Sequence, residues 1–364
     1  MNAAKSSRYH RARRYADGAA CLVAAAVLAT LLLTGWSASL RTAAGGRPSL
    51  YAIAVLLLVG AALLPISLYR GYWLERQYQL SETSAVRWLR GRMSIGVLAV
   101  AAAGLLAELL AWSMGWPHLW WAIAALFCAA AAALLTASGP VFFLPLLEGS
   151  RPVSRDPLRQ RLESLSARAG VPVLGIDELP LGHRSRRVSA ALVGAGATRR
   201  IVLSDTLLNN YSDDEIEVVM AHEMGHHIHR HVLKSLAAEF FLLLAAFRAA
   251  AAALDASWRW LGLTSAADLA GLPLVVLTVG GVLLAATPLL NVWSRAHERR
   301  ADRFALETAS RPAAFIGVVR RMAAQNLAEE RPSSAAFLLF HTHPTAEERI
   351  AAAREVLEKR HSSG

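Results

Sequence analysis

Residues 272–293 read LPLVVLTVGGVLLAATPLLNVW, an almost entirely apolar stretch without a charged side chain. A helix needs about 20 residues to cross the roughly 30 Å of hydrocarbon in a bilayer, so this stretch predicts a membrane span. Five other stretches are similarly long and apolar: 18–36, 50–68, 94–112, 119–138 and 236–254. A hydrophobic fraction of 55% and a mean hydropathy of +0.36 agree with this pattern. The sequence therefore predicts a mostly α-helical, polytopic membrane protein with about six spans.

Two of these stretches have a second interpretation. Basic residues precede 18–36 and Ser-Ala-Ser follows at 37–39, which also fits a cleaved secretory signal, although the apolar run exceeds the usual length of about 7–15 residues. The stretch 236–254 contains Glu239 and Arg248, which also fits a buried helix of a soluble domain. The other four are nearly free of charge and have tryptophans at their ends, as expected at a membrane interface: Trp112, Trp116, Trp120, Trp121 and Trp293.

The distribution of basic residues predicts the orientation of the chain and argues against a nucleic-acid partner. The formal net charge is +11. With the N-terminus in the cytoplasm, the outer connections contain only Arg41, Arg47 and Arg259 as basic residues. The inner segments are all rich in arginine: 1–17, 69–93, 147–235 and 294–364. This asymmetry follows the positive-inside rule, and anionic lipid head groups of the bilayer account for the charge better than nucleic acid does.

We expect four segments along the chain. Residues 1–146 form an N-terminal transmembrane region with four spans, and 236–293 form a transmembrane hairpin with two. The polar segments are 147–235 and 294–364, and both are predicted to lie in the cytoplasm.

The first polar segment shows three local patterns. Leucines recur at helical spacing near 156–169, and short apolar runs near 187–204 predict a small β-hairpin. Ser212 followed by Glu215 is a capping-box signature that opens another helix.

That helix carries a metal-binding pattern, His222-Glu223-Met224-Gly225-His226. Two histidines four positions apart lie on one helix face and can bind the same zinc ion. Glu223 stands next to the first of them, where its carboxylate can take a proton from a water molecule and later deliver it to a leaving amine. Three further histidines follow, and we expect them to form an exposed polar cluster that does not bind the metal: His227, His229 and His231.

A catalytic zinc ion usually has three protein ligands, so a third ligand should lie elsewhere in the chain. Residues 291, 295, 298 and 302 share one helix face directly after the last span, and this polar stripe is either solvated or part of the site. The last two spans are expected to form an antiparallel hairpin. The stripe and the histidine helix would then lie at the same face of the membrane, close together in space. His297 points about 100° away from Glu298 and is excluded from the stripe.

Several separated motifs resemble the type I CAAX prenyl endopeptidase family, a group of integral-membrane gluzincin metalloproteases. The resemblance covers roughly residues 60–350. It rests on SLYR at 67–70 with Glu75, GAGATRRIVL at 194–203 followed by DTLL at 205–208, HEMGH at 222–226, SRAHERRAD at 294–302, and THP at 342–344 with Glu348 and Arg349. It implies that Glu298 is the third zinc ligand and that Asp302 steadies a ligand histidine. It also implies that His343 helps to stabilise the transition state.

The expected activity is that of a zinc metalloendopeptidase cutting peptides or membrane proteins at the cytoplasmic membrane face. The resemblance suggests C-terminal processing of CAAX-type peptides, and removal of damaged membrane proteins is the alternative. A signal-transducing sensor is disfavoured because the outer loops are too short to fold as a ligand-binding domain. A zinc protein without catalysis is disfavoured because a structural site has no use for Glu223. The oligomeric state is not indicated by the sequence.

Overall fold

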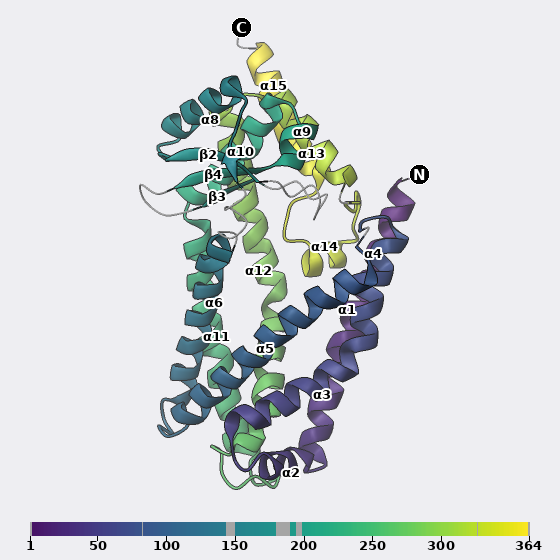
Figure 1. Cartoon of the computed structure of the whole chain (residues 1–364), viewed down its shortest axis with the longest axis vertical. Helices are drawn as coiled ribbons and strands as arrows, with labels where there is room; N and C mark the ends of the chain where they lie inside the picture. The colour runs from purple at the N-terminus through teal and green to yellow at the C-terminus, as the bar shows by residue number, and fades with distance from the viewer. Residues whose placement is uncertain are drawn as a thin grey trace. The chain divides into compact units, whose positions relative to one another are not determined.

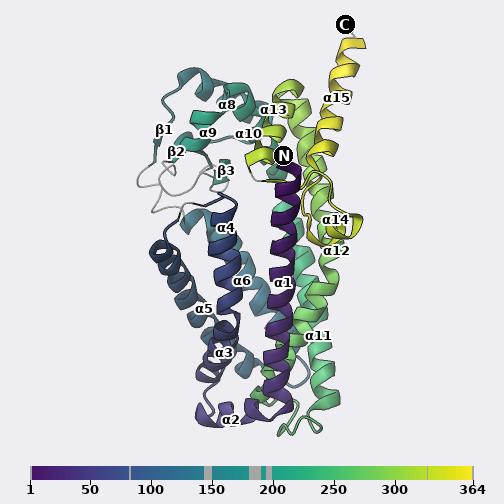
Figure 2. The same ribbon diagram turned by 90° about the vertical axis from the view of Figure 1, so that its right-hand side faces the viewer.

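The computed structural model describes residues 2–81, 83–142, 150–179, 190–193, 199–325 and 327–362 (Figures 1 and 2). Its contacts divide the chain into two compact units. The first, called the polar unit, comprises residues 1–7, 134–235 and 287–364, and the second, called the apolar unit, comprises residues 8–133 and 236–286.

The apolar unit is built from helices, some of which continue into the polar unit. They are α1 (Asn2–Leu33), α2 (Trp36–Ala43), α3 (Pro48–Leu68), η1 (Tyr69–Trp73), α4 (Leu74–Gln77), α5 (Ala85–Ser113), α6 (Trp120–Phe142), α11 (His231–Ser257), η3 (Leu269–Gly271) and α12 (Leu272–Thr308). Among the described residues, five helical stretches are long and apolar enough to cross a membrane, and α6 contains a shorter apolar helix over Trp120–Thr136. Each of the six predicted stretches therefore lies largely in a helix, which confirms the predicted fold class.

Most apolar side chains of these helices are not covered by protein. In the most apolar window of each candidate span, only 17% to 28% is buried inside the structure. The buried residues form small clusters, one of which joins Leu110, Phe247 and Leu254. Such sparse internal packing is expected where lipid tails, rather than water, surround a helix bundle.

The polar unit contains a four-stranded sheet with the order β1-β2-β4-β3. Its strands are β1 (Arg151–Pro152), β2 (Gly175–Leu179), β3 (Ala190–Val193) and β4 (Arg200–Ser204). β3 pairs antiparallel with β4, so the predicted hairpin is present in the described part of 187–204, and β2 lies parallel to β4 on its other side. The remaining helices of the unit are α8 (Asp156–Arg168), α9 (Asp205–Asn210), α10 (Asp213–Ile228), α13 (Pro312–Gln325), α14 (Ser334–Phe340) and α15 (Ala346–Ser362).

Helix α10 lies at the centre of the polar unit and packs against α8, α13 and β3 (Figure 1). Its capping box forms as predicted, because Ser212 accepts from the backbone of Glu215 while the Glu215 carboxylate accepts from the backbone of Ser212. The leucines predicted to line one face of α8 are fully buried in the same core as Ile216 and Met220. The sequence of α10 therefore determines where the helix starts and which of its faces is buried in the core.

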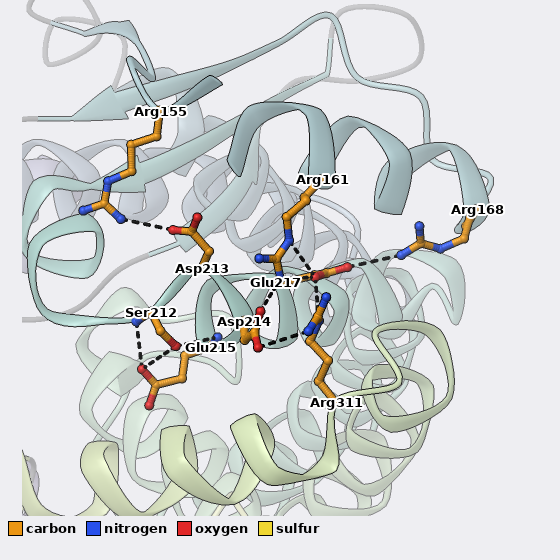
Figure 3. Close-up of polar contacts among 9 residues, drawn as sticks. All are labelled: Arg155, Arg161, Arg168, Ser212, Asp213, Asp214, Glu215, Glu217 and Arg311. Carbon is orange, nitrogen blue, oxygen red and sulfur yellow. Dashed lines mark hydrogen bonds and ion pairs between the residues drawn. The ribbon is translucent and has the colours of Figure 1, made fainter. Parts of the chain in front are cut away.

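A buried carboxylate ties α10 to its neighbours. Glu217 is 4% exposed and receives three arginine side chains (Figure 3). Arg161 and Arg168 of α8 approach it to 2.6 and 3.2 Å, and Arg311, just before α13, to 3.0 Å. A buried charge is tolerated only when it is paired in this way, so the network orients α10 relative to α8 and the start of α13.

Helix α12 approaches α10 very closely at a glycine. A Cβ placed on Gly225 would lie 3.0 Å from Cα of Ala301 and 3.3 Å from Cβ of Phe304. Only glycine at position 225 therefore permits this separation without displacement. This contact brings the C-terminal part of α12 against the face of α10 that carries the predicted metal ligands.

Candidate metal centre

His222 and His226 lie one turn apart on α10, and their Nε2 atoms face each other at 3.1 Å. Glu298 of α12 completes the group. Its Oε2 atom lies 3.5 Å from Nε2 of His222, and its Oε1 atom lies 3.4 Å from Nε2 of His226. The structure thus brings Glu298 together with two histidines that lie more than seventy positions before it in the sequence.

The spacing of these donor atoms fits a small tetrahedral metal ion. Zinc binds imidazole nitrogen and carboxylate oxygen at about 2.0–2.2 Å, so two tetrahedral ligands are separated by about 3.3–3.6 Å. The three observed separations are 3.1, 3.4 and 3.5 Å, close to this range, and the two that involve Glu298 are measured to different oxygens of its carboxylate. In addition, Oε2 of Glu298 is buried, and the ring nitrogens nearest to it are Nδ1 of His343 at 2.8 Å and Nε2 of His222 at 3.5 Å.

The electrostatics of the bare site also favour a cation. Burial would lower the pKa of His222, but its contacts with Asp302 and Glu298 outweigh burial and raise the pKa to about 9. Burial and the neighbouring His222 lower the pKa of His226 to about 4. Near neutral pH only the His222 ring is therefore cationic in the bare site, although the carboxylates attract further positive charge. One metal ion held by both neutral rings satisfies all three side chains.

Asp302 lies one turn beyond Glu298 on α12 and contacts the opposite side of the His222 ring. Its Oδ1 atom is 2.9 Å from Nδ1 of His222. Arg349 of α15 donates to both carboxylate oxygens of Asp302, at 2.6 and 2.8 Å. A metal-bound imidazole commonly directs its outer nitrogen at a carboxylate, so this arrangement suits the expected role of Asp302. Sequence reasoning included Arg349 among the residues that resemble the family but assigned it no role.

Glu223 and His343 lie at the edge of the same group. Burial raises the pKa of Glu223, although its side chain remains partly accessible. His343 belongs to the connection between α14 and α15; its side chain is 64% exposed, and its Nδ1 atom lies 2.8 Å from Oε2 of Glu298. Both side chains are therefore positioned where a substrate can reach them.

The polar stripe of α12 is buried, so its interpretation as a solvated face is wrong. Asn291, Arg295, Glu298 and Asp302 are each 7% exposed or less. Asn291 donates to the carbonyl of Leu338, at 3.0 Å. Arg295 donates to the carbonyl groups of Phe337, within α14, and of His341, just after it, at 3.1 and 2.5 Å. One end of the stripe, Glu298 and Asp302, thus belongs to the candidate metal site. The other end, Asn291 and Arg295, holds the segment before His343.

The three additional histidines differ in their exposure to solvent. His227 is exposed and His229 is partly exposed, close to what the sequence predicts. His231 is only 3% exposed, contrary to the prediction of an exposed side chain, because the ring of His297 stacks on it with centroids 4.1 Å apart. His297 itself lies outside the group of converging donor atoms, as its helix position predicts.

The fold and this group of side chains define a multi-pass membrane protein with the site of a metallopeptidase. Residues 152–357 match peptidase family M48, and residues 2–148 match the N-terminal region of CAAX prenyl proteases, described as five membrane helices. The first match covers more than half of the chain. The chain therefore belongs to peptidase family M48 and is a membrane metalloprotease, and this family membership implies a bound metal.

Individual relatives agree with this assignment. An uncharacterized metalloprotease of Bacillus subtilis, YhfN, is 27% identical over 77% of this chain and 67% of its own length. CAAX prenyl protease 1 of Saccharomyces cerevisiae is 32% identical over 47% of this chain and 38% of its own length. The crystal structure of S. mikatae Ste24p has the same fold, with a TM-score of 0.69 and 23% identity over 84% of this chain and 75% of that one.

Proposed function

We propose that the protein is a zinc metalloendopeptidase in which His222, His226 and Glu298 bind the zinc ion. The observation that carries the proposal is the convergence of their donor atoms at separations of 3.1 to 3.5 Å. Two imidazoles and one carboxylate leave a fourth tetrahedral position open, which is the arrangement of a catalytic rather than a structural site. When bound, zinc supplies a Lewis acid that polarises the scissile carbonyl group.

The remaining residues have separate roles in this proposal. Glu223 accepts a proton from the attacking water and delivers it to the leaving amine, and its raised pKa brings the carboxyl group closer to the pH at which it must do both. His343 donates a hydrogen bond to the oxygen on which negative charge develops. Asp302, held by Arg349, keeps the His222 ring in the orientation in which Nε2 faces the metal position.

We further propose that the site faces the cytoplasm and acts on CAAX-type C-terminal peptides. The excess of arginine in the segments on one side of the spans supports the orientation. The name of the yeast relative, CAAX prenyl protease 1, supports the substrate class. In this proposal the partners are a lipid-attached peptide or membrane-protein substrate and the bilayer itself.

The test uses the full chain in detergent or nanodiscs. We expect about one zinc per chain and chelator-sensitive cleavage of a prenylated peptide, with both zinc and cleavage lost in Glu298→Ala. Undiminished cleavage by metal-free protein would contradict the zinc site. Equal cleavage of prenylated peptides, unprenylated peptides and unfolded membrane proteins would instead favour removal of damaged membrane proteins.

The orientation has its own test in intact cells. A cysteine placed at the exposed position Glu355 on α15 is expected to resist a membrane-impermeant thiol reagent, whereas one at Arg259 is expected to react. The opposite labelling pattern would place the site outside the cytoplasm.

A further inference from the structure

The proposed ligand His226 makes a hydrogen bond that the catalytic assignments above do not use. Its Nε2 atom faces His222 and Glu298, and its other ring nitrogen, Nδ1, lies 3.0 Å from Nδ1 of His231. His231 is the first residue of α11, just beyond the turn that ends α10. The contact therefore joins a predicted ligand to the start of the next helix.

Metal binding leaves one arrangement of hydrogens at this contact. A neutral imidazole carries a single N–H, so when Nε2 of His226 binds a metal, Nδ1 carries the hydrogen and donates it. Nδ1 of His231 must then be the acceptor, which places the hydrogen of that ring on Nε2. In the described part of the chain Nε2 of His231 has no hydrogen-bond partner, so the bond to His226 is the only one this ring makes.

The surroundings of His231 hold its ring in one plane. The side chain is buried, and the ring of His297 stacks on it at 4.1 Å with an interplanar angle of 8°. His297 in turn meets the edge of Trp293, with centroids 5.2 Å apart. A ring clamped in this way presents its acceptor in a fixed direction.

The two proposed ligand histidines are thus supported in different ways. Nδ1 of His222 meets a carboxylate that is itself paired with Arg349, whereas Nδ1 of His226 meets another imidazole ring. Support of this kind orients a ligand ring and raises its basicity, and its removal typically weakens metal binding by about 10–100-fold.

We propose that His231 is a positioning residue that accepts the Nδ1 hydrogen of His226 and so fixes the ring and tautomer in which His226 binds the metal. The proposal rests on the proposed zinc site, in which His226 is a ligand.

Two substitutions of His231 separate hydrogen bonding from packing. His231→Asn keeps an acceptor oxygen close to the position of Nδ1 but loses the stacked ring. His231→Phe keeps a flat ring against His297 but has no acceptor. The zinc dissociation constant of each full-length variant is measured by competition with a chelator, and the melting temperature of the zinc-free protein is measured alongside. The spectrum of the cobalt-substituted protein reports the geometry of the site independently of activity.

We expect His231→Phe to weaken zinc binding by about 10–100-fold and to change the cobalt spectrum, and His231→Asn to remain within a few-fold of the wild type. Unchanged zinc binding in His231→Phe would overturn the proposal. A greater loss of zinc in His231→Asn than in His231→Phe would also overturn it, because the ring would then act by packing. His226→Ala tests the underlying site: if it binds zinc as tightly as the wild type, His226 is not a ligand and the proposal fails with that assignment.

Discussion

Replacement of Gly225 by alanine tests whether the separation of α10 and α12 sets the spacing of the metal ligands. Gly225 lies between the two proposed ligand histidines in sequence, and Glu298 lies one turn before Ala301 on the opposing helix. The added Cβ would stand 3.0 Å from Cα of Ala301, whereas ordinary contact begins at 3.4 Å. The helices must therefore separate by about 0.4 Å, which exceeds the tolerance of about 0.2 Å on metal–ligand distances.

Two energies of opposite sign act on folding in this variant. Overpacking of a close contact costs about 1–3 kcal/mol, while alanine stabilises a helix by about 1 kcal/mol relative to glycine. The net effect on the zinc-free protein is thus a loss of zero to about 2 kcal/mol. The gain in helix propensity stabilises the fold but does not restore the ligand spacing. We therefore expect zinc affinity to fall by about tenfold, with peptidase activity falling in parallel at limiting zinc.

The assay compares zinc dissociation constants and zinc-free melting temperatures of Gly225→Ala and Gly281→Ala. Gly281 lies within α12, and a Cβ added there would meet no atom within 4 Å, so alanine changes helix propensity at that position without a close contact. The control should bind zinc like the wild type. Wild-type affinity in Gly225→Ala as well would show that this contact does not set the ligand spacing.

Four further substitutions, the last with a comparison variant, probe the other parts of the site and its support. Glu223→Gln should keep its zinc, measured by mass spectrometry, while kcat falls by at least about 10²-fold because the amide cannot accept a proton. Asp302→Ala should weaken zinc binding by about 10–100-fold in chelator competition. His343→Ala should keep zinc and melting temperature but lower kcat by about 10²–10³-fold, with a smaller change in KM. Glu217→Gln should destabilise the zinc-free protein by about 3 kcal/mol in denaturant unfolding, because three arginines lose their buried partner, whereas Arg168→Ala should cost under about 1 kcal/mol.

The membrane helices were predictable because hydropathy alone determines which segments enter a bilayer. Local signals likewise predicted the capping box at Ser212 and the hairpin of β3 and β4. β2 was not predicted, because its alignment parallel to β4 depends on a partner distant in sequence and leaves no local signature. The start of α1 at Asn2 was also missed: the apolar run marks only the part of the helix in lipid, while the basic segment before it is helical as well.

The side chains that converge at the candidate metal site were predicted in part for the same reason. The histidine pair on α10 and the stripe on α12 are periodic patterns, visible within single helices. The burial of His231 could not be predicted from the sequence. It depends on the ring of His297, which belongs to α12 and lies more than sixty positions further along the chain. The pairing of Asp302 with Arg349 likewise joins α12 to α15. Contacts between helices of this kind become apparent only when their packing is known.

The length of α12 relates the proposed zinc site to the membrane. The helix is unbroken over 37 residues, about 55 Å, and is too long to lie entirely within roughly 30 Å of hydrocarbon. Its charge-free part ends at Trp293, an interfacial type of residue, and Glu298 follows about 8 Å further along the axis. We therefore expect the proposed ligand Glu298 to lie near the head groups. A substrate bond held there by a membrane anchor would reach the metal without leaving the bilayer surface, which is the physical reason to test lipid-attached peptides first.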